Sequence, residues 1–375
     1  MTNRQHTAAD VHRIQWMDNL RTMTILLVVL YHVGGVYESA GLWAWFWIVD
    51  DPATLTWVGI IGIVLDIFMM PTLFFISGYL TPGSLKNKTE WEFVKGKFKR
   101  LMIPWIFAVV TLIPAYKVIF LYSRNLPQEN WQTYFHITNP NSQNWLWFLP
   151  VLFLFEMLFL LFSKTKIGIP HVSFKSAVWG TFLLGFIYSI SIGSMLGFRS
   201  WTLTPLIDFD NERLLAYFSV FMLGVFCFDR KVFLKKPGNK LQYSVISSMA
   251  WFPVTVHIFT RIYPFFYSEG FSVTLQYRLI WWLSFYLSLL CLLYIMIETF
   301  WRYFNKEGKI WSELNRNSYG VYIIHVIVIG VFGTLLLRSN LPAVLKYLSL
   351  IILTYLVSNL IVSYSRKLLK KLQSV

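Results

Sequence analysis

The sequence carries little charge for its length, and this scarcity excludes a soluble globular protein. Charged residues make up 14% of the 375 positions, whereas hydrophobic residues make up 56%. The two cysteines, Cys227 and Cys291, lack metal-ligand spacing, and a disulfide framework is not expected from them. The polar N-terminal stretch has no short apolar segment followed by a cleavage site. We therefore expect no signal peptide and a first apolar helix that stays as a membrane anchor.

Long apolar runs are present instead, many of them longer than the 18 residues that indicate a membrane helix. We predict an all-α polytopic membrane protein with about ten transmembrane helices and no internal repeat. The whole chain, 1–375, is expected to form one transmembrane domain, with a cytoplasmic segment at 1–21 and a basic cytoplasmic tail at 365–375. The expected spans are 22–38, 57–80, 101–122, 145–163, 174–193, 212–228, 243–262, 276–300, 317–337 and 342–364.

The net charge of +15 is compatible with nucleic-acid binding, but its distribution indicates membrane orientation. With the N-terminus in the cytoplasm, the inner segments hold 24 lysines and arginines and the outer segments hold six. This asymmetry predicts that both chain ends are cytoplasmic. The partner implied is a lipid bilayer and not nucleic acid. Loop lengths and charge suit a multi-pass protein of a bacterial inner membrane.

Arg21 and His32 share one face of the first expected helix. They are eleven residues apart, which is about three helical turns and roughly 16 Å along the axis. An arginine at the membrane surface would therefore lie below an imidazole near the midplane. An ionisable group at that depth costs free energy unless it is paired or faces water. His32 is either hydrogen-bonded to a neighbouring helix or takes part in chemistry, and its own helix leaves both readings open.

The second expected helix carries Asp66 and Ser77, which are also eleven residues apart. If the two helices pack antiparallel, one register sets Asp66 opposite His32 and Ser77 opposite Arg21. A carboxylate beside an imidazole fixes its tautomer and makes it a better base. The alternative is that Asp66 serves another partner or a water molecule. Gly78 follows Ser77, and so small a residue lets a helix or a ligand approach closely.

The inner segment after this helix ends in a dense basic stretch, which contains Lys97, Lys99 and Arg100. Such a stretch is a common topology signal. It is also what a phosphate-rich ligand requires, with Arg21 nearby to add a fork of donors. On the outer side, the segments 39–56, 123–144 and 194–212 are rich in aromatic, amide or acidic side chains, which suit either the membrane interface or a sugar. His325, in the ninth expected helix, is either structural or functional.

Together these motifs resemble acyltransferase family 3, a family of membrane acyltransferases, and they cover nearly the whole chain in order. The resemblance rests on Asp18, Arg21 and His32; on Phe74-Phe75-Ile76-Ser77-Gly78-Tyr79; on Lys97-Phe98-Lys99-Arg100 with Pro104; on Trp147-Phe148-Leu149; and on Ser318-Tyr319-Gly320, Tyr322 and His325. The second helix and the Trp-Phe-Leu segment are similar to the glucan biosynthesis protein C branch, whose members are thought to succinylate periplasmic glucans.

The resemblance implies that acyl-CoA is used from the cytoplasm and that the acyl group passes to a hydroxyl of a sugar or glycolipid outside. His32 is then the catalytic histidine and Arg21 helps to hold the donor. Lys97 and Arg100 match a pair of basic family residues, with lysine in place of the usual arginine at the first. Many members carry an aspartate just before the double phenylalanine, where this chain has Leu73. A role for Asp66 therefore rests on the helix register alone.

We accordingly expect an O-acyltransferase that transfers an acetyl or succinyl group to a glycan, with acyl-CoA as co-substrate and no permanent cofactor or metal. The expected site residues are His32 and Asp66 for catalysis; Arg21, Ser77, Tyr79, Lys97, Lys99 and Arg100 for the acyl donor; Asp18 and His325 in support; and Asn144 and Trp147 on the acceptor side. His32 is either a general base or an acylated carrier. The alternative is an exporter of an acylated glycan, with a kink near Pro71 as its gate. An oligomer is possible.

Overall fold

The computed structural model describes residues 14–39, 48–86, 88–135, 144–165, 172–234, 237–266, 271–306 and 308–373. Most of the expected cytoplasmic N-terminal segment, the last two residues of the expected tail, and parts of two expected outer segments (40–47 and 136–143) lie outside this range. Within it the chain is almost entirely helical.

The helices follow one another along the whole described chain. They are α1 Gln15–Tyr37, α2 Thr56–Leu85, α3 Glu90–Lys97, α4 Ile103–Ser123, α5 Phe148–Lys164, α6 Phe174–Leu196, α7 Leu214–Asp229, α8 Lys240–Met249, α9 Trp251–Ile262, α10 Leu275–Tyr303, α11 Lys309–Leu337 and α12 Ala343–Gln373. Two short strands, β1 Trp201–Leu203 and β2 Asp208–Asp210, pair antiparallel before α7.

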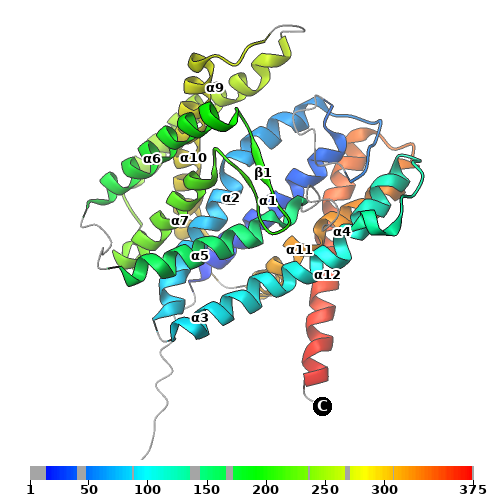
Figure 1. Cartoon of the computed structure of the whole chain (residues 1–375), viewed down its shortest axis with the longest axis horizontal. Coiled ribbons are helices and arrows are strands. Elements are labelled where there is room, and N and C mark those ends of the chain that lie inside the picture. The colour runs from blue at the N-terminus through cyan, green and yellow to red at the C-terminus, as the bar shows by residue number, and fades with distance from the viewer. Residues whose placement is uncertain are drawn as a thin grey trace, which may run out of the picture.

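Nine helical spans in the described residues are long and apolar enough to cross a membrane, and each coincides with an expected span. The shorter apolar helix α7 coincides with the remaining one, the expected span 212–228. The expected all-α polytopic fold is therefore confirmed. Figure 1 shows α1 and α2 in the middle of the molecule, with α6, α7, α9 and α10 on one side and α4, α11 and α12 on the other.

Helix α2 packs very closely against α7 because a glycine of each helix faces the backbone of the other helix. A Cβ added to Gly78 would lie 1.9 Å from the carbonyl oxygen of Phe221, and one added to Gly224 would lie 2.2 Å from that of Phe75. Neither position can hold a side chain unless the helices separate. The expected role of Gly78 in a close approach is thus seen between two helices. The contact fixes α7, and so the residues just before it, against the middle of α2.

Two helix boundaries differ from expectation. The basic stretch before residue 101 is helical, because Thr89 and Glu92 form a capping box that starts α3. A π-helical segment, η1 Phe98–Met102, joins α3 to α4 without a break. At the other end of the chain, the expected basic tail continues α12 as far as Gln373, beyond the rest of the molecule in Figure 1.

Two other features bear on the site. Helix α2 is one continuous helix through Pro71 and Pro82, so a gate near Pro71 would be a bend within the helix and not a break in it. The expected span 243–262 is divided at Ala250 into α8 and α9. Pro253, which cannot donate a backbone hydrogen bond, lies in the first turn of α9, where that loss is tolerated.

Candidate active site

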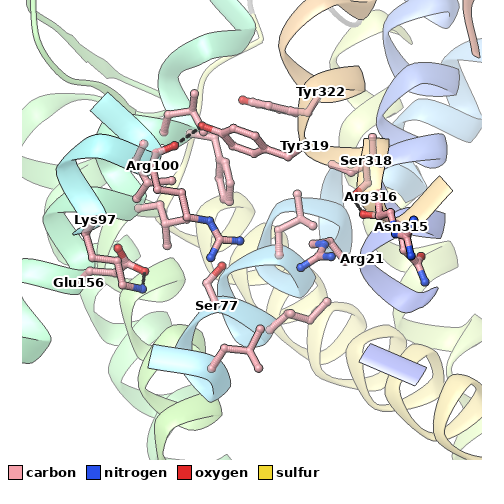
Figure 2. A pocket seen from close by; sticks show the side chains of 18 residues that line it. Arg21, Ser77, Lys97, Arg100, Glu156, Asn315, Arg316, Ser318, Tyr319 and Tyr322 are labelled. Atoms are coloured by element: carbon pink, nitrogen blue, oxygen red, sulfur yellow. Dashed lines mark hydrogen bonds and ion pairs between the residues drawn. The ribbon is translucent and has the colours of Figure 1, made fainter. Parts of the chain in front are cut away.

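Two cavities lie at different levels along α1 and α2. The first, called the basic cavity, has a volume of about 250 Å³ and is lined by Arg21, Lys97, Arg100 and Arg316 together with apolar residues. Arg21 comes from α1, Arg100 from η1 and Arg316 from α11. Figure 2 shows the guanidinium groups of Arg21 and Arg100 facing the same space, with Ser77 of α2 beside them.

Positive charge dominates the basic cavity. In the part of the chain that the structure describes, four cationic side chains line it against one carboxylate, Glu156 of α5. Glu156 is buried and forms an ion pair with Lys97. Arg21 is held by Asp18 one turn earlier, with Nη2 donating to Oδ1 over 2.8 Å. The lining therefore keeps a surplus of cations, which favours a ligand with several negative charges.

Two of the expected donor-binding residues do not line this cavity. The Tyr79 ring is buried between α2 and the chain after α7, with its centroid 5.5 Å from that of Phe228 and 5.4 Å from that of Phe233. It is therefore a core residue. Lys99 is exposed and does not belong to the lining, whereas its neighbour Arg100, also exposed, does.

The second cavity, called the histidine cavity, has a volume of about 100 Å³. It is lined by His32 of α1, Asp66 of α2, Tyr217 of α7 and Arg261 of α9, and by aromatic, amide and charged residues between the helices or at their ends: Asn144, Trp145, Trp147, Arg199, Trp201, Asp210 and Arg213. The two residues expected on the acceptor side, Asn144 and Trp147, are both in this lining. Trp147 stacks on Tyr217, with ring centroids 6.0 Å apart. Aromatic faces next to amide groups suit the apolar face and hydroxyls of a sugar.

His32 pairs with a second histidine, His325 of α11. Nε2 of His325 lies 2.8 Å from Nδ1 of His32, and Nδ1 of His325 lies 2.7 Å from the carbonyl oxygen of Tyr322. A carbonyl oxygen only accepts, so Nδ1 of His325 donates to it. In a neutral His325 ring, Nε2 then accepts from Nδ1 of His32. The lone pair of a neutral His32 is thereby assigned to Nε2, the form required of a base or a nucleophile.

The expected direct pair between Asp66 and His32 is wrong. Both carboxylate oxygens of Asp66 accept from Arg213, at 3.1 and 2.9 Å, and the partner that orients His32 is His325. Asp66 pairs with Arg213 and not with His32 because a guanidinium group binds a carboxylate through two parallel charged hydrogen bonds. The expected contact between Arg21 and Ser77 is also replaced, since Arg21 binds Asp18. Each expected pair nevertheless lines one cavity, as the proposed helix register requires.

Arg213 is a site residue that sequence reasoning passed over. It directly precedes α7 and also approaches Asp210, with 3.5 Å between Nε and Oδ2. Asp210 is placed by the hairpin, where it pairs with Trp201, and burial raises the pKa of its carboxyl. The distribution of charge along the sequence could have indicated Arg213. The outer segments hold only six arginines, and three of them, Arg199, Arg213 and Arg261, line this cavity.

An aromatic layer separates the two cavities. Phe148 and Tyr322 line the basic cavity and have ring centroids 5.8 Å apart. Phe74 is fully buried, with its centroid 4.8 Å from that of Phe148 and 6.4 Å from that of Trp147. Over the described residues, the two linings have no member in common. The two cavities are therefore neighbours at different levels of the bundle, with these aromatic side chains lying between them.

Comparison with known proteins adds two findings. A family model described as an acyltransferase domain matches residues 14–363, nearly the whole chain. The protein called glucans biosynthesis protein C, from Salmonella typhi and from Salmonella typhimurium strain LT2, is 26% identical over 145 residues. That match covers 37% of this chain and 36% of each of these relatives, so the similar part spans about a third of the curated proteins.

Proposed function

The chain belongs to the acyltransferase family whose model spans residues 14–363, and from that membership we propose an integral-membrane O-acyltransferase. It moves an acetyl or succinyl group from acyl-CoA in the cytoplasm to a hydroxyl of a glycan on the other side of a bacterial inner membrane. The relatives named for glucan biosynthesis support a glucan-like acceptor. Each part of this proposal draws on a different cavity.

The basic cavity supports acyl-CoA as the donor. Its four lining cations, Arg21, Lys97, Arg100 and Arg316, outnumber the one lining acid among the described residues. The phosphates of CoA are the kind of ligand that such a surplus attracts, and guanidinium groups bind phosphate through two parallel hydrogen bonds. The cavity also lies at the end of the bundle that carries the excess of lysine and arginine, and the positive-inside rule supports a cytoplasmic position for that end.

The observation that carries the proposal is the placement of His32. Its imidazole lines the histidine cavity, and His325 holds it in the tautomer that has its lone pair on Nε2. As a general base, Nε2 takes the proton of the acceptor hydroxyl while that oxygen attacks the thioester, and CoA leaves as the thiol or thiolate. As a carrier, Nε2 attacks the thioester first, CoA leaves, and the hydroxyl then takes the acyl group from the imidazole.

The test is a transfer assay with purified full-length protein in lipid nanodiscs. Free CoA is measured from acetyl-CoA and from succinyl-CoA, with and without a bacterial β-glucan, and acylation of the glucan is followed by mass spectrometry. We expect glucan-dependent release of CoA and a matching mass increase on the glucan. Folded protein that releases no CoA from either donor, with or without glucan, would refute the proposal.

A further inference from the structure

Helix α11 contacts the walls of both cavities. Arg316 and Tyr319 line the basic cavity, Tyr322 lies in the aromatic layer, and His325 contacts His32. Tyr319 and Tyr322 are three residues apart, which is roughly 4.5 Å along the helix axis, so their side chains are neighbours on one side of α11. The helix therefore passes from the arginines of the basic cavity to the imidazole of the histidine cavity.

The hydroxyl of Tyr319 donates a hydrogen bond to the backbone carbonyl oxygen of Arg100, over 2.7 Å (Figure 2). In an α-helix, the donor for the carbonyl oxygen of residue 100 is the backbone N–H of residue 104. Residue 104 is a proline, which has no backbone N–H, and it follows the π-helical segment η1. The Tyr319 hydroxyl thus gives Arg100 the hydrogen bond that Pro104 cannot donate.

This hydrogen bond fixes the backbone of a residue that lines the basic cavity. Arg100 is exposed, and its guanidinium faces the same space as that of Arg21 (Figure 2). Tyr319 ties the backbone of Arg100 to α11, whose Arg316 lines this cavity too. Cations from separate elements are thereby held near one another before a ligand arrives. Such preorganisation reduces the entropy that is lost when a polyanion binds.

Tyr322 makes the corresponding contact to the wall of the histidine cavity. Its hydroxyl donates to the backbone carbonyl oxygen of Trp145, and the indole N–H of Trp145 donates to the carbonyl oxygen of Ile323 over 2.9 Å. Trp145 is buried and belongs to the short helix η4 Asn144–Trp147, whose two end residues also line the histidine cavity. The two hydrogen bonds fix this wall to the part of α11 that carries His325.

We propose that Tyr319 and Tyr322 are positioning residues for the two substrates. The Tyr319 hydroxyl sets Arg100 for the acyl donor, and the Tyr322 hydroxyl sets η4 for the acceptor beside His32. This inference rests on the proposed function, because it assigns one cavity to each substrate. The two hydroxyls are chemically alike but hold different walls, so their removal should change different kinetic constants.

The kinetic experiment compares purified full-length Tyr319→Phe and Tyr322→Phe with acetyl-CoA or succinyl-CoA and a bacterial β-glucan. Each substitution removes one hydroxyl and keeps the ring. Tyr319→Phe should raise the KM for acyl-CoA about fivefold, the effect of one neutral hydrogen bond, and leave the KM for glucan unchanged. Tyr322→Phe should raise the KM for glucan by a similar factor and leave that for acyl-CoA unchanged. Changes that do not separate the two substrates would overturn the inference while leaving the acyltransferase intact.

Tyr286→Phe is the matched control. Tyr286 is buried, its hydroxyl is hydrogen-bonded to that of Ser189, and it lines neither cavity. Both of its KM values should equal those of the wild type. A second variant tests the reason for the Tyr319 contact: in Pro104→Ala, residue 104 offers a backbone N–H to the Arg100 carbonyl, so the loss caused by Tyr319→Phe should be smaller. An equal loss in that background would contradict a role through this carbonyl.

A binding experiment does not require turnover. Thermal unfolding is followed at increasing concentrations of CoA, which should raise the midpoint of the wild type and of Tyr322→Phe alike. Tyr319→Phe should need about fivefold more CoA for the same rise. Equal CoA dependence in all three proteins would overturn the role of Tyr319 alone. No rise in the wild type would remove the donor site, and with it both the proposed function and this inference.

Discussion

The basic cavity and the histidine cavity use their charged side chains in opposite ways. The basic cavity presents four cations, of which Lys97 pairs with Glu156 and Arg21 with Asp18, so each acid there serves one cation and positive charge is left over. In the histidine cavity, over the described residues, three arginines face two acids, and Arg213 is taken up by both of those acids. The first arrangement suits affinity for a polyanion. The second suits positioning, because most of its charges already hold one another in place.

The two cavities also differ in their neutral groups. The histidine cavity contains the imidazole of His32 and a wall of aromatic rings, including Trp147 and Tyr217. The polar neutral groups of the basic cavity, such as Ser77 and Asn315, lie near its arginines. The comparison predicts that binding of the donor and chemistry on the acceptor can be changed separately. Substitutions in one cavity should change KM for the donor, and substitutions in the other should change kcat.

The largest effect is expected from His32→Ala. General acid–base catalysis contributes about 10²- to 10⁴-fold, so transfer should fall roughly a thousandfold while the donor KM changes little. The measurement is kcat for CoA release by the purified variant. The matched control is His257→Gln, which replaces another buried histidine that contacts Ser284 and lines neither cavity. Wild-type turnover in His32→Ala would show that His32 is not catalytic, and the histidine cavity would then have no demonstrated part in the chemistry.

The next effect is expected from His325, which acts through His32. His325→Ala removes the acceptor for Nδ1 of His32 and should lower kcat roughly a hundredfold, since the tautomer is no longer imposed. His325→Gln keeps an oxygen that can accept that hydrogen bond, so it should recover part of the loss. The pH profile of kcat should shift in the alanine variant. Equal losses in both variants with an unchanged profile would indicate a packing role only.

Much of the scaffold follows from the sequence, because membrane spans depend on hydrophobic length, which is a local property. The helix register was also accessible, since the spacing of eleven residues is the same in α1 and α2. It correctly groups Asp66 with His32 and Ser77 with Arg21 at the level of cavities. The register alone does not determine which of the neighbouring groups forms hydrogen bonds with a given carboxylate.

The pairing of Asp66 illustrates this limit. Its partner, Arg213, is 147 residues away and reaches the cavity only because the close contact of Gly78 and Gly224 brings α7 onto α2. Similarly, His325 lies 293 residues from His32. Both contacts depend on helix packing that no local pattern encodes. Lys99 and Tyr79 lie outside the basic cavity for a related reason: the sequence places them next to site residues, but only the packing of the helices decides which side chains line the cavity.

A smaller effect, confined to the donor, is expected in the basic cavity. Arg100→Gln should raise the KM for acyl-CoA about tenfold and leave kcat nearly unchanged, because one charged contact to phosphate is lost. The wild-type KM should rise with salt, and less steeply in the variant, since screening weakens charge contacts. The matched control is Arg230→Gln, on an arginine that pairs with Asp229 and does not line the cavity. A salt-independent wild-type KM would contradict a phosphate site here.

The smallest effect is on stability and concerns Glu212, whose carboxylate accepts hydrogen bonds from the backbone N–H of Arg199 and from the indole of Trp282. Burial raises the pKa of this carboxyl from 4.5 to about 7. A group with a raised folded-state pKa contributes stability that is complete below pH 4.5 and is lost as the pH rises through about 7. The unfolding temperature of the wild type should therefore fall from pH 5.5 to pH 8.5 by more than that of Glu212→Gln, which has no proton to lose. Asp208, whose pKa burial raises to about 6, adds a fall common to both proteins. Parallel curves would mean that the carboxyl is ionised throughout this pH range and that burial does not raise its pKa.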